Sequence, residues 1–379
     1  MNSSYLDTAD RIAARLCRDA VWSRGRCNWT GDFYQDEDVI GHATLTPNMY
    51  EGVSGIALFL HRMAFATGDR IFRITAEGAL RLALERVPMP ECGLYTGGVG
   101  VYYVAAEMGR EIDGGAMIEQ SAIDRAELDV MSGSAGIIAG LLALRRRKHS
   151  ARFLEAAVQH GDVLLDEACK DASGWSWSGL DAARNLTGFS HGAAGIGWAL
   201  TELYAATQEL RFRDAALEAF RYERSCWNPE EKNWPDFRED EVSYPVFWCH
   251  GAAGIALSRL RAWQILRDEQ LLAEALSGLA TVRDEMGSAQ NYSLCHGEFG
   301  NADLLIYASE VFKDETWLAQ AQTAAETGVE RFERRRVPWP CGLYEANETP
   351  GLMLGLAGIG HFYLRMADPG RTPTVLLPL

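Results

Sequence analysis

Two Cys-His pairs occupy the same place in a recurring sequence pattern, directly before a Gly-x-x-Gly motif. Cys249 and His250 precede GAAG, and Cys295 and His296 precede GEFG. Thiolate and imidazole are the usual protein ligands of zinc, and three such ligands leave the fourth tetrahedral position for a substrate. We therefore predict one zinc ion bound by Cys249, Cys295 and His296, with His250 as an alternative to His296. Free cysteines are also common in protein cores, but their recurrence at one repeat position favours ligands.

Two further polar residues stand upstream of other copies of the motif. His191 directly precedes GAAG at 192–195, and Asp129 lies four residues before GSAG. Histidine gains and loses a proton near neutral pH, and a carboxylate can hold it in one tautomer. The alternatives are a buried structural histidine and a helix-capping aspartate. We predict that His191 and Asp129 belong to the same site as the zinc ligands.

The motif occurs seven times, which predicts the elements that position these residues. An apolar run follows each copy, as in a buried helix, and segments such as 315–335 between copies have the periodicity of amphipathic helices. We predict seven pairs, each an outer helix followed by an inner one that begins at the motif. Such pairs form an all-helical α/α toroid, one domain over residues 1–379, although periodicity does not separate a closed ring from an open array. The first glycines are Gly52, Gly97, Gly133, Gly192, Gly251, Gly297 and Gly355.

Composition narrows the class of protein. The net charge of −16 disfavours nucleic-acid binding, which usually needs a basic excess. No segment reaches the roughly 18 apolar residues of a membrane span, and the polar N-terminus lacks a signal peptide's apolar core. We therefore expect a cytoplasmic protein without a disulfide framework. Segments 170–188 and 226–247 are predicted to be surface loops. The remaining cysteines and histidines are interpreted as loop, surface or core residues: Cys17, Cys27, Cys92, Cys169, Cys226, Cys341, His42, His61, His149, His160 and His361.

Over nearly its whole length the sequence resembles the LanC-like superfamily, the lanthionine synthetase cyclases. Its motifs are most similar to those of the C-terminal cyclase domain of class II (LanM-type) synthetases. The C-terminal segment ADPGRTPTVLLPL adds to that similarity. It starts at Met1 without a dehydratase region, so we expect a stand-alone cyclase or a domain of a larger synthetase. The phrases that carry the resemblance are NMYEGVSGIALFL, LDVMSGSAGI, GFSHGAAGIGWAL, FWCHGAAGIALSRL, SLCHGEFGNADLL and PGLMLGLAGIGHFYLRMADP.

The resemblance implies roles for the residues singled out above. It implies an α/α toroid with Zn²⁺ bound by two cysteines and a histidine, which fall on Cys249, Cys295 and His296. The family's general acid/base histidine falls on His191, and an aspartate that assists it falls on Asp129. The implied reaction adds peptide cysteine thiols to dehydroalanine or dehydrobutyrine and forms thioether rings. The implied partners are a dehydrated ribosomal precursor peptide and a separate dehydratase.

Two positions depart from the family pattern. Some members have an arginine where this chain has Pro245, and some have a tyrosine where it has His250. We assign substrate binding to His250 and leave Pro245 without a role. Two alternative functions stay open within the superfamily: addition of glutathione to dehydroamino acids in proteins, and a non-catalytic, zinc-stabilised peptide-binding platform. A glycosidase on a similar fold would need paired carboxylates, and only Asp129 is a candidate.

Overall fold

The computed structural model describes residues 3–36, 39–148, 150–180, 182–343 and 348–378, so His149 lies outside the described part of the chain. These residues form two compact units. Unit 1 consists of Met1–Met89, Gly100–Ile112 and Met286–Leu377, and unit 2 consists of Pro90–Val99, Asp113–Glu285 and Pro378–Leu379. No described helix is long and apolar enough to cross a membrane.

The inner helices begin at the Gly-x-x-Gly motifs, as predicted. Their first two turns are buried on all sides, and every residue of the last one is buried. Such helices need apolar side chains on all faces because no face meets water. The inner helices are α2 (Val53–Thr67), α4 (Gly98–Glu107), α6 (Ser134–Lys148), α8 (Ala193–Thr207), α10 (Ala252–Leu266), α12 (Glu298–Phe312) and α14 (Leu356–Ala367).

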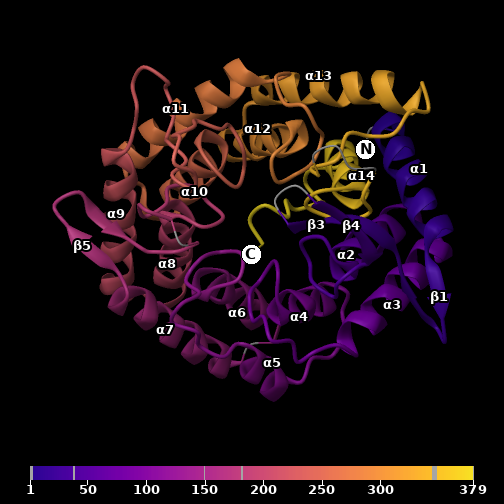
Figure 1. Ribbon diagram of the computed structural model, residues 1–379, viewed down its shortest axis with the longest axis horizontal. Helices are drawn as coiled ribbons and strands as arrows, with labels where there is room; N and C mark the ends of the chain where they lie inside the picture. The colour runs from indigo at the N-terminus through magenta and orange to yellow at the C-terminus, as the bar shows by residue number, and fades with distance from the viewer. Residues whose placement is uncertain (1–2, 37–38, 149, 181, 344–347, 379) are drawn as a thin grey trace. The chain divides into compact units, whose positions relative to one another are not determined.

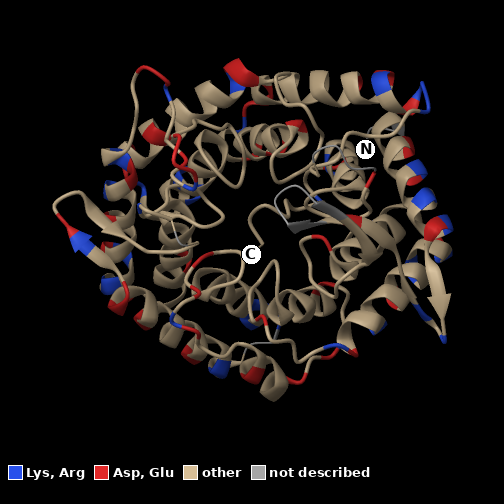
Figure 2. Ribbon diagram, in the orientation of Figure 1, with Lys and Arg blue, Asp and Glu red and all other residues tan. Residues whose placement is uncertain are grey.

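The outer helices are amphipathic, and Figure 2 shows the charged residues of unit 2 mainly on its outer helices. Within the pairs, an inner helix packs on the outer helix that follows it, as α2 on α3 and α8 on α9, while α14 packs on α1 (Figure 1). Along the chain an outer helix precedes each inner helix, as predicted, although these contacts join the inner helix mainly to the outer helix that follows it. The outer helices are α1 (Ser3–Asp19), α3 (Arg70–Leu84), α5 (Gly114–Gln120), α7 (Ala151–Asp166), α9 (Leu210–Ser225), α11 (Glu269–Glu285) and α13 (Leu318–Gly328).

The segment predicted as one helix over 315–335 is divided. A 3₁₀ turn (Glu315–Trp317) precedes α13, and a π-helical turn (Val329–Glu333) follows it. The first part of the predicted loop 170–188 is instead a hairpin of β5 (Cys169–Asp171) and β6 (Gly174–Ser176). The adjacent Trp177 is buried and donates its indole N–H to the carbonyl of Leu164. This apolar anchor made the surface-loop prediction wrong in this part.

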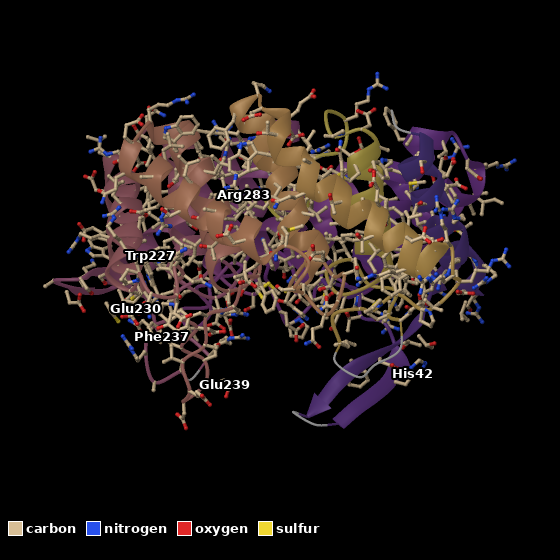
Figure 3. The ribbon with its side chains drawn as sticks, turned by 90° about the horizontal axis from the view of Figure 1, so that it is seen from above. His42, Trp227, Glu230, Phe237, Glu239 and Arg283 are labelled. Atoms are coloured by element: carbon tan, nitrogen blue, oxygen red, sulfur yellow. The ribbon has the colours of Figure 1, made fainter. Side chains whose placement is uncertain are left out.

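Two more hairpins were not predicted, and both lie in unit 1. One joins β1 (Val21–Ser23) to β2 (Arg26–Asn28), and the other joins β3 (Thr30–Asp36) to β4 (Val39–Thr44). The β3–β4 hairpin, which carries His42, extends away from the helices of its unit (Figure 3). In the predicted loop 226–247, Trp234 is buried and isolated bridges such as Asp236 to Ser243 fix the chain.

Candidate metal centre and catalytic pair

In six of the motifs the second glycine lets the preceding loop pack against the first turn of the inner helix. A Cβ atom at Gly195 would lie 2.0 Å from the carbonyl oxygen of Phe189, and one at Gly254 would lie 2.0 Å from that of Trp248. Only glycine permits so close an approach of backbone to backbone. In both cases the carbonyl belongs to the residue six positions earlier. The side chains between are therefore held at equivalent places, with Cys249 corresponding to Ser190 and His250 to His191.

Backbone hydrogen bonds join these loops to one another in unit 2. The N–H of Val130 donates to the carbonyl of Ser190 at 3.1 Å, and the N–H groups of Phe189 and Ser190 donate to the carbonyl of Cys249 at 3.1 Å each. Three consecutive motif loops thus form one hydrogen-bonded series. The series brings Asp129, His191, Cys249 and His250 to one end of the inner helices of this unit, as the repeat alignment predicted.

Asp129 and His191 form a fixed pair within this group. Oδ2 of Asp129 accepts a hydrogen bond from Nδ1 of His191 at 2.5 Å, while Oδ1 accepts from the backbone N–H groups of Ser132 at 2.8 Å and Gly133 at 3.2 Å. The carboxylate therefore caps the loop and orients the ring at the same time. With a proton on Nδ1 directed at Asp129, His191 presents Nε2 as the nitrogen that can exchange a proton with a substrate.

His250 lies beside this pair. Its ring stacks on that of His191 with centroids 5.9 Å apart, and Nε2 lies 3.4 Å from the hydroxyl of Ser190. Burial lowers the pKa of His250 to about 4, so the ring is neutral at pH 7. The side chain is 2% exposed, and Nδ1 has no hydrogen-bond partner among the described residues, its nearest carboxylate being that of Asp236 at 3.7 Å.

A buried glutamate that the sequence analysis did not single out supports the His191 loop from outside. Oε1 of Glu223 accepts hydrogen bonds from the N–H groups of Gly188 at 2.8 Å and Ala194 at 2.9 Å, and Oε2 accepts from Arg259 at 2.8 Å. Burial raises the pKa of the Glu223 carboxyl, and the guanidinium and N–H groups oppose this rise. Glu223 lies on α9 and Arg259 on α10, so the contact ties the His191 loop to both helices.

Unit 1 holds the second Cys-His pair in a loop of the same form. The N–H groups of Leu294 and Cys295 donate to the carbonyl of Met353 at 3.1 and 3.0 Å, and the N–H of Met353 donates to the carbonyl of Tyr50 at 2.7 Å. His296 follows Cys295 and lies two residues before α12 begins. The pattern of backbone contacts is therefore the one seen in unit 2.

The ligand atoms of this second pair have defined neighbours. The hydroxyl of Tyr50 donates to Sγ of Cys295 at 2.9 Å, and Nε2 of His296 lies 2.6 Å from the carbonyl oxygen of Gly342. A carbonyl only accepts, so this contact places the ring proton on Nε2 and the lone pair on Nδ1. Sequence reasoning missed Tyr50, although it stands two residues before its motif glycine, as Cys249 and Cys295 do.

Other histidines and cysteines singled out in the sequence, and Pro245, lie in loops or make contacts within the fold. His160 is buried, with contacts to the Ser134 hydroxyl at 3.0 Å and the Ser121 carbonyl at 2.9 Å. His42 lies on β4 and pairs with Asp32 at 2.7 Å. Cys92 and Cys341 are in loops, as predicted. The carbonyl of Pro245 accepts a hydrogen bond from the side chain of Asn233 at 3.0 Å, which fixes the loop before Cys249.

The curated proteins that resemble this chain include relatives of differing extent. Lacticin 481/lactococcin biosynthesis protein LcnDR2 of Lactococcus lactis subsp. lactis is 23% identical over 411 residues, covering 100% of this chain and 40% of that protein. Glutathione S-transferase LANCL1 of Danio rerio is 27% identical over 128 residues, covering 33% of this chain and 29% of that protein. The chain therefore spans less than half the length of these relatives.

Solved structures show the fold. Nisin cyclase superposes with a TM-score of 0.71 at 14% identity, covering 98% of this chain and 97% of that one. A family 76 α-mannanase of Bacteroides thetaiotaomicron gives 0.57 at 14% identity, covering 97% and 96%. The fold is thus of the α/α-toroid class, as predicted, and this class includes both a cyclase and a glycosidase. The fold alone does not distinguish a cyclase from a glycosidase.

The family follows from the sequence itself. Residues 43–377 match the family model described as lanthionine synthetase C-like protein. This range contains all seven Gly-x-x-Gly motifs and every predicted site residue. The chain therefore belongs to the lanthionine synthetase C-like family.

Proposed function

We propose that this chain is a zinc-dependent cyclase that joins peptide cysteine thiols to dehydroalanine or dehydrobutyrine residues of the same peptide. The observation that carries the proposal is the fixed Asp129–His191 pair, whose loop is hydrogen-bonded to the backbone of Cys249. A proton donor held beside a thiol ligand is the arrangement that a thiol addition needs. Family membership supports the same reaction class.

The proposed zinc ligands are Cys249, Cys295 and His296, each of which offers one ligand atom. Two thiolates and one imidazole suit zinc and leave one tetrahedral position for a substrate. The hydrogen bond from Nε2 of His296 to Gly342 favours Nδ1 as its ligand atom. The proposal requires the Cys249 loop of unit 2 to meet the Cys295 loop of unit 1, and so requires the two units to act as one domain.

The zinc ion would lower the pKa of a peptide thiol placed at the open position and so supply a thiolate at neutral pH. The thiolate sulfur adds to the β-carbon of the dehydro residue, the carbon–carbon double bond becomes an enolate, and a proton is returned to the α-carbon. His191 supplies that proton from Nε2 while Asp129 stabilises the ring's charge through Nδ1. The proton lost by the substrate thiol replaces the proton that His191 gives up. The net reaction is therefore an isomerisation of the peptide.

His250 remains the proposed substrate-binding residue. Its unpartnered Nδ1 and its stacking on His191 support a contact with the peptide next to the proton donor. The dehydrated precursor peptide is the proposed substrate. The chain spans only 40% of LcnDR2, and we propose that the dehydro residues are made by a dehydratase outside this sequence.

The test offers the purified chain a peptide that contains one cysteine and one dehydroalanine, and follows free thiol by alkylation and mass spectrometry. Cyclisation leaves the mass unchanged and prevents alkylation. Metal analysis should give one zinc per chain, and Cys295→Ala and His191→Ala should each slow the loss of thiol. If Cys295→Ala cyclised as fast as the unmodified chain, the zinc mechanism would be wrong.

Glutathione added to a cysteine-free dehydroalanine peptide forms the second arm, prompted by the LANCL1 relative. A mass increase equal to glutathione, without ring formation in the first arm, would assign intermolecular thiol addition instead. One zinc per chain with neither reaction would identify a binding platform.

A further inference from the structure

A polar cavity of about 430 Å³ lies in unit 1 beside the loop that leads to Cys295 and His296. It is enclosed by this loop, the start of α12 and one face of α13. Its volume is in the range of ligand pockets. Its polar lining includes Gln290, Tyr292, Glu298, Thr323, Thr327 and Arg331.

Glu298 lines the inner side of this cavity, and the residue is 4% exposed. Oε1 accepts a hydrogen bond from the N–H of Gly287 at 2.8 Å, whereas Oε2 is buried without a hydrogen-bond partner among the residues described. An unsatisfied buried carboxylate oxygen is costly, and a ligand that donates to it recovers that cost.

The outer part of the cavity has the opposite charge. Arg331 is exposed and hydrogen-bonds the buried phenol of Tyr292, which also feels the charge of Glu298. The cavity is therefore negative at its inner wall and positive at its mouth. This polarity matches a ligand with a cationic end directed inward and a carbonyl or carboxylate directed outward. The chain's net charge of −16 also favours the approach of cations.

We propose that this cavity binds a lysine side chain of a peptide, with its ammonium on Oε2 of Glu298 and its backbone carbonyl facing Arg331. The identity of that peptide as the cyclase substrate rests on the function proposed above. Glu298 follows His296 by two residues, and Asn291, next to Gln290 of the lining, donates to the carbonyl of His296 at 3.2 Å. A lysine bound here would hold the peptide against the segment that carries two proposed zinc ligands.

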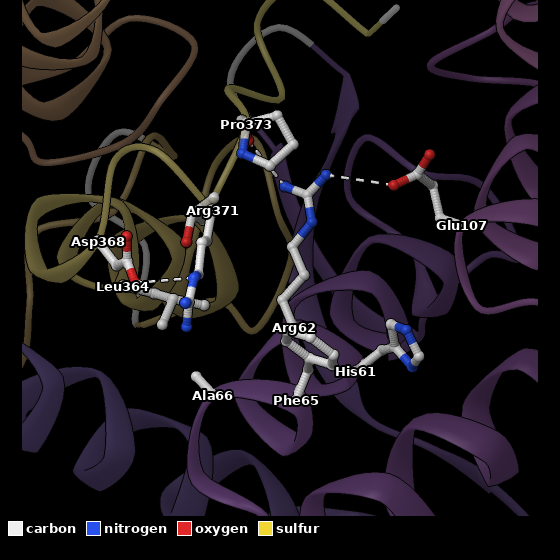
Figure 4. A pocket seen from close by; sticks show the side chains of 10 residues that line it. His61, Arg62, Phe65, Ala66, Glu107, Leu364, Asp368, Arg371 and Pro373 are labelled. Carbon is white, nitrogen blue, oxygen red and sulfur yellow. Dashed lines mark hydrogen bonds and ion pairs between the residues drawn. The ribbon is translucent and has the colours of Figure 1, made fainter. Parts of the chain in front are cut away.

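A second cavity of unit 1, between the ends of α2 and α14, is a poorer ligand site. Its central cation, Arg62, already donates to the carbonyl of Pro373 at 2.9 Å and pairs with Glu107 at 3.6 Å (Figure 4). Arg371 pairs with Asp368 at 3.9 Å at its edge. The charged side chains of this second cavity are thus already paired with one another, unlike the carboxylate of Glu298.

The test is calorimetric binding of two short peptides to the full chain: acetyl-Gly-Lys-Gly-amide, and the same peptide with norleucine, which lacks the ammonium. We expect the lysine peptide to bind at least tenfold tighter. Glu298→Gln should remove that preference. Thr323→Trp should abolish binding by filling the mouth while Glu298 is intact, and Gln322→Trp, an exposed neighbour outside the cavity, should leave binding unchanged.

Equal affinity for both peptides would overturn the proposal, as would equal losses in the Thr323→Trp and Gln322→Trp variants. Butylamine is tested in a further experiment. If butylamine bound as tightly as the lysine peptide, the cavity would be a site for free amines rather than for a peptide. Because binding is measured without turnover, a failure to cyclise would contradict the proposed function and leave the lysine site standing. Cyclisation without lysine binding would contradict the site alone.

Discussion

Arg259→Met is expected to destabilise unit 2 by more than any surface ion-pair variant. The guanidinium of Arg259 is fully buried and pairs with Glu223 at 2.8 Å and Glu274 at 2.7 Å. Glu223 is fully buried as well. Methionine matches the length of the arginine stem but leaves the Glu223 carboxylate without its cation in a site closed to water. An uncompensated buried charge is among the most destabilising changes a protein can undergo.

Removal of one partner of a buried ion pair costs about 3–5 kcal/mol. With an unfolding entropy of about 2.1 cal/mol/K per residue, the whole chain of 379 residues would lose roughly 4–6 °C in Tm. The assay is thermal unfolding by calorimetry and circular dichroism at pH 7. Adding Glu223→Met to Arg259→Met should not restore stability, because the N–H groups of Gly188 and Ala194 would then lose their acceptor.

Arg224→Met is the matched control. Arg224 pairs with the same Glu274, but its side chain is 33% exposed and exposed pairs contribute about 0–1 kcal/mol. The control should change Tm by about 1 °C or less. Equal shifts for Arg224→Met and Arg259→Met would refute the argument from burial. A double variant as stable as the unmodified chain would refute the role of the backbone donors.

Three further predictions follow from the site and its surroundings. Asp129→Asn removes a charge-assisted hydrogen bond to His191 worth about 1.5–3 kcal/mol, so the cyclisation rate should fall about 10- to 150-fold; a rate within twofold would contradict it. Tyr50→Phe removes the hydroxyl that contacts Cys295 and should weaken zinc affinity about 10-fold or more in a chelator competition. Burial lowers the pKa of His361 well below its usual value, so stability should fall as pH drops below about 6.5; urea titrations of His361→Gln should show a smaller fall.

Features set by local sterics could be predicted from the sequence. In six of the motifs the second glycine is required by a carbonyl only six residues earlier, and the motif marks the start of an inner helix in every copy. His191 and Asp129 were placed together by the same alignment, because equivalent loops present their side chains at equivalent points. The motifs shared with the family indicated the roles of His191 and Asp129 but not their geometry.

Features set by distant contacts could not be predicted. Glu223 supports a loop some 30 residues earlier in the chain, and no local pattern distinguishes it from a surface glutamate on an amphipathic helix. The β5–β6 hairpin depends on the burial of Trp177 against α7. Which outer helix packs on a given inner helix also depends on tertiary contacts, because periodicity identifies a buried face without identifying the helix that covers it.

The division of the chain between the two units sets an order of assembly during protein synthesis. Unit 2 is nearly continuous, from Asp113 to Glu285, whereas unit 1 combines Met1–Met89 with Met286–Leu377, and α1 packs on α14. The first part of unit 1 must wait for the ribosome to add nearly 200 residues, roughly 10–40 s at typical rates. The face of α1 that packs on α14 waits longer, for more than 330 residues between Asp19 and Leu356, and is a natural point for a chaperone to engage. Cys249 therefore belongs to a unit that can fold once Glu285 has been added, whereas Cys295 belongs to a unit that stays incomplete until α14 follows it.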